Sequence, residues 1–168
     1  MLVQVESPGW LGFDAFRTRC ALGRAGVIEA AQKREGDLAT PLGRFPLREV
    51  WFRPDRIAPP PRTGLACRPL TPAMGWCDDP EDARYNQHVT LPYPARCEQL
   101  WREDHVYDLL VVLGYNDAPV QKGRGSAIFW HLAQPDFRPT EGCVAIAREP
   151  MLEILAQLAP GAEIEIRR

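Results

Sequence analysis

The stretch AIFWHLAQPDFRPTEGCVAIA, residues 127–147, decides how this chain folds. Its two ends, AIFWHLA (127–133) and CVAIA (143–147), are short apolar runs that predict buried strands, and a loop with two prolines joins them. Strands that follow one another in the sequence usually pair or lie close together. We therefore expect His131, near the end of the first strand, to lie within hydrogen-bonding reach of Cys143 at the start of the second.

This pair of residues has a chemical and a structural interpretation. A thiol with a free pKa of roughly 8.5 is only a few per cent ionised at neutral pH, so a catalytic cysteine needs a base such as His131. Gly142 lets the backbone approach a substrate closely, and the amide of Cys143, helped by that of Gly142, is a candidate oxyanion-hole donor. In a β-rich domain, however, a cysteine is more often a small buried apolar residue and a histidine more often structural. A metal site has no obvious third and fourth ligands.

The segments around this stretch predict a β-rich chain. Seventeen prolines in 168 residues favour strands, turns and ordered loops over long helices. An amphipathic C-terminal helix is expected at 149–158, a helical turn or two at 95–103, and a long ordered loop at 54–80. Strands are expected at 2–6, 11–23, 26–31, 45–52, 88–93, 106–116 and 160–166, in addition to the two strands of 127–147. The run 106–116 is apolar on both faces and should be central.

Length and composition limit the class of protein further. A chain of 168 residues can build its own core, so we expect one domain over 1–168, and the strands and helix predicted above place it in the α+β class. Twenty basic residues against 22 acidic ones, with no basic cluster, argue against a nucleic-acid partner. The longest apolar run, 109–113, is too short to span a membrane, and no signal peptide is visible at the N-terminus.

The motifs around His131 and Cys143 resemble a known family. HLAQPDFRPTEGCVAI, preceded by GSAIFW and far upstream by KREGDLATPLGRFPL, is similar to the L,D-transpeptidase catalytic domain (YkuD-like). The commoner family pattern has a histidine before the glycine and a polar or basic residue two places after the cysteine, where this chain has Glu141 and Ala145. The gap from His131 to Cys143 is also shorter than usual. With GYN at 114–116 and GRGSAIF at 123–129, these departures resemble a shorter-motif branch of the family.

The resemblance implies strongly curved mixed β-sheets in a sandwich-like or barrel-like fold, and a reaction on peptidoglycan without a cofactor. Cys143 would be the nucleophile and His131 the general base. The thiolate would attack the carbonyl on the L-centre of diaminopimelate in a tetrapeptide stem, release D-Ala and transfer the acyl group to an amine of a second stem. Some members of the shorter branch are thought to use the amine of L-Ala as acceptor. Transfer to water would make an L,D-carboxypeptidase, and loss of chemistry would leave a noncatalytic peptidoglycan-binding module. A carbapenem should acylate the thiol.

Further residues are candidates for substrate contact. An arginine at 124 could clamp a substrate carboxylate and Asn116 could bond the stem amide, although a solvated charge and a turn former are equally good interpretations. Thr140 could hydrogen-bond the turn that leads to Cys143, and Glu141 could select an amine acceptor, although its charge would oppose thiolate formation. The remaining candidates for the substrate groove are Tyr85, Asn86 and Ser126.

Location and cysteine chemistry are less constrained. The family implies the periplasm or cell envelope, while the absence of a visible signal keeps cytoplasmic action on recycled fragments as an alternative. We expect a monomer. In an oxidising compartment four cysteines could form two disulfides by any of three pairings, and otherwise all would be thiols. These four are Cys20, Cys67, Cys77 and Cys97.

Overall fold

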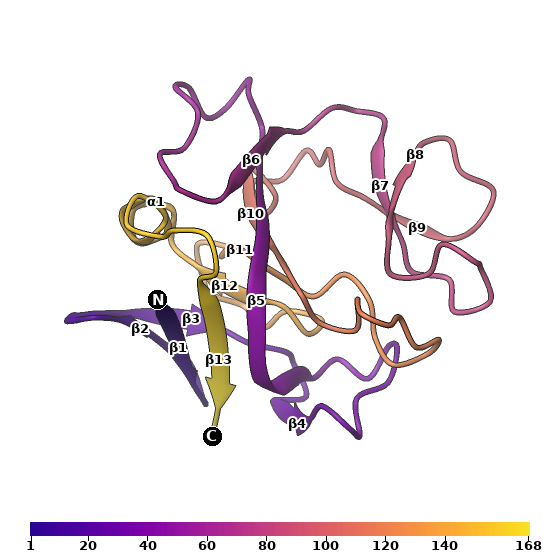
Figure 1. The fold of residues 1–168 in the computed structure, drawn as a ribbon, viewed down its shortest axis with the longest axis horizontal. Coiled ribbons are helices and arrows are strands. Elements are labelled where there is room, and N and C mark those ends of the chain that lie inside the picture. Colours follow the sequence, from indigo (N-terminus) through magenta and orange to yellow (C-terminus); the bar gives the residue numbers. More distant parts are fainter.

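The computed structural model describes residues 1–168 as a curved, mainly β structure with one short helix (Figure 1). The helix is α1 (Arg148–Leu155). The strands are β1 (Leu2–Glu6), β2 (Trp10–Phe13), β3 (Phe16–Ala21), β4 (Val27–Glu29), β5 (Thr40–Phe52), β6 (Ala66–Pro69), β7 (Met74–Cys77), β8 (His88–Thr90), β9 (Cys97–Gln99), β10 (Leu109–Leu113), β11 (Phe129–Leu132), β12 (Val144–Ile146) and β13 (Glu163–Arg167). This confirms a mainly β fold with a C-terminal helix.

The larger sheet closes into a barrel. Its order is β10-β11-β12-β3-β2-β1-β13-β5, and β5 also pairs with β10, so the path returns to its first strand. The 13-residue β5 makes this possible because its first half pairs with β13 and its second half with β10 across a bulge, and Figure 1 shows it running through the middle of the molecule. Parallel pairs such as β11–β12 occur beside antiparallel ones, so the sheet is mixed, as the sequence predicted.

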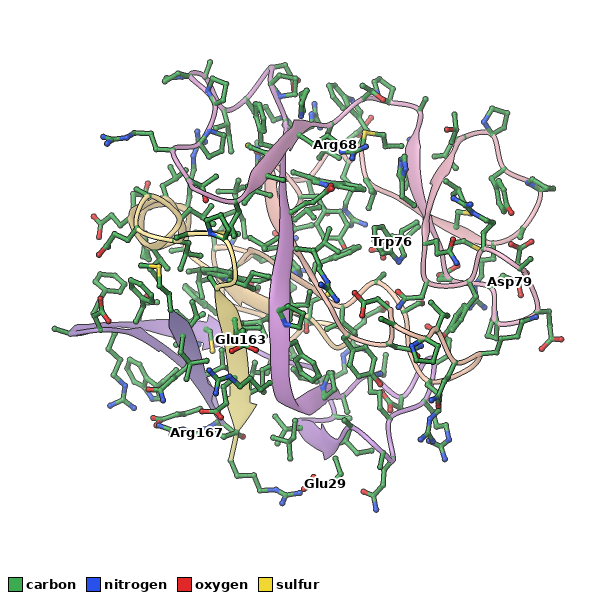
Figure 2. All side chains as sticks on the ribbon, viewed as in Figure 1. Glu29, Arg68, Trp76, Asp79, Glu163 and Arg167 are labelled. Atoms are coloured by element: carbon green, nitrogen blue, oxygen red, sulfur yellow. The ribbon has the colours of Figure 1, made fainter.

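A second sheet, with order β8-β7-β9, covers one side of the barrel. Its three strands lie together on the opposite side of β5 from α1 (Figure 1). The side chain of Trp76, on β7, lies between this sheet and the barrel (Figure 2), where its ring packs 5.1 Å from that of Phe129 and 5.8 Å from that of Trp51.

Alternation along the strands separates two apolar clusters. On β10 the side chains of Leu109, Val111 and Leu113 belong to a 28-residue core inside the barrel. Those of Leu110 and Val112 belong to a 12-residue cluster between the barrel and the three-stranded sheet. Successive residues of a strand point to opposite faces, so the run that the sequence marked as apolar on both faces is indeed buried on both. Each fully buried large apolar side chain contributes about 1.5–3 kcal/mol to this packing.

The same alternation orients the two strands on which the site is built. Trp130 of β11 and Val144 of β12 point into the barrel core. Phe129 and Cys143 point outward into the cluster beneath the three-stranded sheet. Helix α1 closes the core with Met151, Ile154 and Leu155 and takes no part in the outer face.

Three local predictions were wrong. Residues 95–103 contain β9 instead of a helical turn, because Cys97–Gln99 pair with β7. The segment 54–80 is not one loop, since β6 pairs with β5 and β7 forms the centre of the small sheet. The single strand expected at 11–23 is the hairpin β2–β3, which turns at Asp14 with a φ of 51°, a conformation that aspartate tolerates better than most residues.

Candidate active site

The thiol of Cys143 and the imidazole of His131 lie on one face of two paired strands. β11 and β12 are parallel, with Trp130 opposite Val144 and His131 opposite Ala145. The loop between them is therefore a crossover and not a hairpin turn. Cys143 precedes Ala145 by two residues, so its side chain shares the face of Ala145 and of His131. Both side chains line the same cavity of about 610 Å³.

The resting thiol of Cys143 is protonated. Its Sγ donates to the carbonyl oxygen of Ala127 at 3.2 Å and receives the amide of Phe129 at 3.4 Å. Burial, together with the charge of Glu98, raises the pKa of the Cys143 thiol to about 12. Ionisation of this thiol therefore requires a base that takes the proton as the sulfur reacts.

His131 is in the form that can accept that proton. Its Nδ1 lies 2.9 Å from the carbonyl oxygen of Leu132, and because a carbonyl only accepts, Nδ1 carries the hydrogen. The lone pair is thereby placed on Nε2, which makes no hydrogen bond within the protein. The resting Cys143 thiol donates to Ala127 instead, so the structure shows no direct hydrogen bond between the two side chains. Burial lowers the pKa of His131 to about 4, so the ring is neutral at pH 7. The ring of Tyr107 packs edge-on against it at 5.2 Å.

The turn before Cys143 leaves one backbone amide free. Gly142 has a φ of 137°, and a Cβ there would lie 3.0 Å from the carbonyl oxygen of Ala39, so a side chain is excluded. Thr140 Oγ1 accepts the amide of Gly142 at 3.1 Å and donates to the carbonyl of Cys143 at 2.7 Å. The Gly142 amide is thus occupied within the turn. The amide of Cys143 has no partner in the protein, so it is free to donate to a bound group.

A carboxylate faces this pair from the three-stranded sheet. Glu98, on β9, lines the cavity and accepts a hydrogen bond from the hydroxyl of the buried Tyr107. Burial raises the pKa of Glu98 to about 7. The guanidinium of Arg102 lies over the Tyr107 ring at 5.3 Å and is held by both oxygens of Asp104 at 2.9 and 2.7 Å.

The sequence prediction missed Glu98 because it assigned 95–103 to a helical turn. On a strand, Glu98 shares a face with Leu100, which is fully buried. An acidic residue two places before a buried leucine would have signalled a partly buried carboxylate.

The cavity is lined by charged groups of both signs. The charged or titratable side chains that line it, besides Cys143 and His131, are Arg24, Lys33, Arg102, Arg138, Glu35, Asp78, Glu98, Glu141 and Tyr107. No group of three or more histidine, cysteine, aspartate or glutamate side chains is placed to hold a metal ion.

Of the predicted groove residues, Ser126, Thr140 and Glu141 line the cavity. Ser126 Oγ donates to a carboxylate oxygen of Glu35 at 2.7 Å. Tyr85 lies behind it and donates its hydroxyl hydrogen to the same oxygen of Glu35. Tyr85 therefore supports the loop before β11 and does not line the groove.

Asn86 also holds that loop from behind. Its Oδ1 accepts from Trp76 Nε1 at 2.9 Å and from the Ala127 amide at 3.0 Å. Its Nδ2 donates to the carbonyls of Tyr115 and Asn116 at 3.0 and 2.8 Å. All four hydrogen bonds are internal, so Asn86 has no capacity left for a substrate.

The structure does not bring Arg124 and Asn116 to Cys143. Both line a separate depression of about 300 Å³. The side chain of Asn116 closes its own turn, with Nδ2 donating to the carbonyls of Gln121 and Gly125 and Oδ1 accepting the Gln121 amide. Of the two interpretations of Asn116, the turn former agrees with these contacts.

All five cysteines are free thiols. Cys77 on β7 and Cys97 on β9 lie directly opposite each other in the small sheet. Cys20 lies on β3 and Cys67 on β6, two strands that are not neighbours in the larger sheet. The described geometry therefore offers one cysteine pair and not two.

Fold and site together define a class: a closed mixed barrel that carries a cysteine and a neutral histidine on one face of paired strands, at one cavity. The chain belongs to the L,D-transpeptidase catalytic domain family (YkuD), whose model matches residues 11–166. Proteins of this family act on peptidoglycan. The structure contains no helix with the length and apolar character needed to cross a membrane.

One solved structure is similar in outline. It is the helical cell shape determining protein Pgp2 from Campylobacter jejuni, with 15% sequence identity and a TM-score of 0.49. The match covers 99% of this chain and 47% of that protein, so the chain spans about half of its length. No curated protein matches the sequence.

Proposed function

We propose that this chain is a peptidoglycan L,D-transpeptidase with Cys143 as nucleophile and His131 as general base. The observation that carries the proposal is the placement of the two side chains on one face of β11 and β12, with the lone pair on His131 Nε2. Membership of a peptidoglycan-directed family supports the choice of substrate.

The first half of the proposed reaction is acylation. His131 Nε2 takes the thiol proton while Cys143 Sγ attacks the carbonyl carbon on the L-centre of diaminopimelate in a donor tetrapeptide stem. The carbonyl oxygen becomes negative and accepts a hydrogen bond from the Cys143 amide. The bond to the terminal D-Ala then breaks, its nitrogen takes the proton from His131, and a thioester remains. A thiol pKa of about 12 agrees with proton transfer in the same step as attack.

The second half transfers the acyl group. An amine of a second stem attacks the thioester, His131 takes a proton from the attacking nitrogen, and the sulfur leaves and regains a proton. The products are a cross-linked dimer and the free enzyme. Attack by water in place of the amine would give a tripeptide stem, the reaction of an L,D-carboxypeptidase.

Incubation with tetrapeptide muropeptides, followed by mass spectrometry, tests the proposal. Dimers with release of D-Ala are expected. Tripeptide with free D-Ala and no dimer would make the protein a carboxypeptidase. Unchanged muropeptides that still bind would make it a noncatalytic binding module and would contradict the proposal.

We further propose that residues 1–168 act as one catalytic domain and as a monomer in the cell envelope, where cross-linked peptidoglycan lies. Cell fractionation with an antibody against the chain separates this location from action on recycled fragments in the cytoplasm.

A further inference from the structure

The proposed nucleophile faces a carboxylate that does not assist acylation. Glu98 comes from β9 of the small sheet, while Cys143 and His131 come from the barrel, and all three line one cavity. A negative charge here opposes formation of the thiolate, and the charge of Glu98 is one cause of the raised pKa of Cys143. Donor attack alone gives no reason for an acid at this position.

The carboxylate of Glu98 also makes no ion pair with a neighbouring cation. The guanidinium whose charge acts on Glu98, that of Arg102, is engaged by both oxygens of Asp104. The hydrogen bond that Glu98 accepts comes from the neutral hydroxyl of Tyr107. Asp78 and Glu141 add negative charge on the same side, and both raise the pKa of Glu98. The cavity therefore holds a carboxylate oriented by Tyr107 that suits a positively charged ligand.

We propose that Glu98 binds the ammonium group of the acceptor stem and removes its first proton. This inference rests on the proposed function, because the acceptor of a transpeptidase is a primary amine that is protonated at neutral pH. In the step, the ammonium gives one proton to the Glu98 carboxylate and becomes a neutral amine. The amine nitrogen then forms a bond to the thioester carbon, its second proton goes to His131, and the carbon–sulfur bond breaks. Glu98 later releases its proton to solvent.

The surroundings of Glu98 suit this role. Its pKa of about 7 makes the carboxylate a proton acceptor matched to neutral pH. The groups that face it are Tyr107 and Arg102 from the segment before β10, Asp78 from the end of β7, Glu141 from the turn before β12, and Cys143. Because Tyr107 also packs against His131, one buried side chain orients both proposed proton acceptors.

Glu98→Gln tests the inference, with Glu103→Gln as a matched control. Glutamine keeps an oxygen that can accept from Tyr107, and Glu103 is an exposed acid that does not line the cavity. Acylation is measured first, as the mass gained by Cys143 with a carbapenem. All three proteins should be acylated, and Glu98→Gln no more slowly than the wild type.

Transfer is then measured as the ratio of dimer to tripeptide at fixed acceptor concentration. Glu98→Gln should lower this ratio by about tenfold or more, since an ionic hydrogen bond to the acceptor is lost. The ratio should recover at alkaline pH, where the amine is already neutral, and Glu103→Gln should match the wild type. An unchanged ratio in an acylated Glu98→Gln protein would overturn the inference and leave the proposed function standing.

Two further measurements separate the remaining outcomes. A wild-type protein that is acylated but only hydrolyses its substrate would overturn the inference, and one that is never acylated would overturn the proposed function with it.

Tyr107→Phe removes the hydrogen bond that lowers the pKa of Glu98, so the pH midpoint of the transfer ratio should move upward. A structural role of Tyr107 alone would leave that midpoint in place.

Discussion

The backbone of Ala127 holds the thiol of Cys143: its carbonyl oxygen accepts the Sγ hydrogen at 3.2 Å. The amide of the same residue donates to Asn86 Oδ1 at 3.0 Å. The orientation of the resting thiol therefore depends on a side chain in the connection between β7 and β8. Ala127 has a φ of 53°, a conformation that the surrounding hydrogen bonds must maintain.

Replacing Asn86 by alanine should therefore destabilise the protein and slow acylation. The change removes four hydrogen bonds to buried or partly buried groups, and Asn86 itself has a φ of 56° that alanine tolerates poorly. We expect a loss of about 2–4 kcal/mol in the free energy of unfolding, measured by urea denaturation. The exposed amide Gln157 is the control, and its replacement by alanine should change stability by less than about 0.5 kcal/mol. Equal stability of the two variants would contradict the positioning role.

Cys143→Ala should abolish dimer, tripeptide and carbapenem adduct while costing only about 1 kcal/mol of stability. His131→Ala should also abolish transfer, because no other neutral base shares the face of the two strands.

Arg124→Ala should leave activity near the wild-type level, since Arg124 lines a different depression. Muropeptide products of the three variants, analysed by mass spectrometry, check all of this. A strong loss of activity in Arg124→Ala would return that residue to the substrate groove.

The acid stability of Glu98→Gln should differ from that of the wild type. The pKa of His131 falls from 6.5 to about 4 on folding, so protonation of the unfolded chain removes stability as the pH falls from 6.5 to 4. The pKa of Glu98 rises from 4.5 to about 7 on folding, so the stability that Glu98 contributes to the folded protein grows as the pH falls from 7 to 4.5. The two slopes oppose each other over the shared window. Each group changes the free energy of unfolding by about 3 kcal/mol across its own pH range. In Glu98→Gln the loss of stability due to His131 should therefore appear without the opposing gain from Glu98.

Urea denaturation of both proteins at intervals between pH 7 and 4 measures this difference. His131→Ala should show the opposite trend and become relatively more stable on acidification. Parallel curves for the wild type and Glu98→Gln would show that Glu98 does not titrate in this range.

Mild oxidation should link Cys77 to Cys97. The amide of Asp78 donates to the carbonyl of Arg96 at 3.2 Å, so the two cysteines form a non-hydrogen-bonded cross-strand pair. Such pairs have Cα atoms about 4.5 Å apart, within the range that a disulfide spans. Burial raises the pKa of Cys97 to about 11, so the reaction should be faster in alkaline buffer. Treatment with oxidised glutathione, followed by peptide mapping, should find this bond in the wild type and not in Cys97→Ser. A bond to Cys67 instead would contradict the strand register.

The sequence alone predicted the parts of the fold in which one segment determines its own environment. Residues 106–116 are apolar on both faces, and β10 is buried on both faces. The helix predicted at 149–158 begins with Arg148 and has Pro150 in its first turn. Such segments carry their signal in their own hydrophobic pattern.

Where a partner strand determines the structure, the sequence failed. Cys97–Gln99 is a strand only because β7 pairs with it, and the misassignment hid Glu98. The contacts of Arg124 could not be predicted either, because the hydrogen bonds of Asn116 close the loop on itself. His131 and Cys143 were identified from motif resemblance and neighbouring strands, whereas the parallel direction of those strands follows from the crossover of the chain.

Because β11 and β12 are parallel and joined by a crossover, the loop between His131 and Cys143 does not set the distance between these two residues. The spacing of His131 and Cys143 is fixed by the ladder of backbone hydrogen bonds between β11 and β12, with Trp130 and Val144 locked into the barrel core behind it. Residues can therefore be added to or removed from 134–139 without changing the separation of the two side chains between which we propose that a proton moves. A loop shorter than the common family spacing is compatible with the same chemistry, and its length is available to evolution for shaping the cavity mouth, where Gln134 and Arg138 already lie.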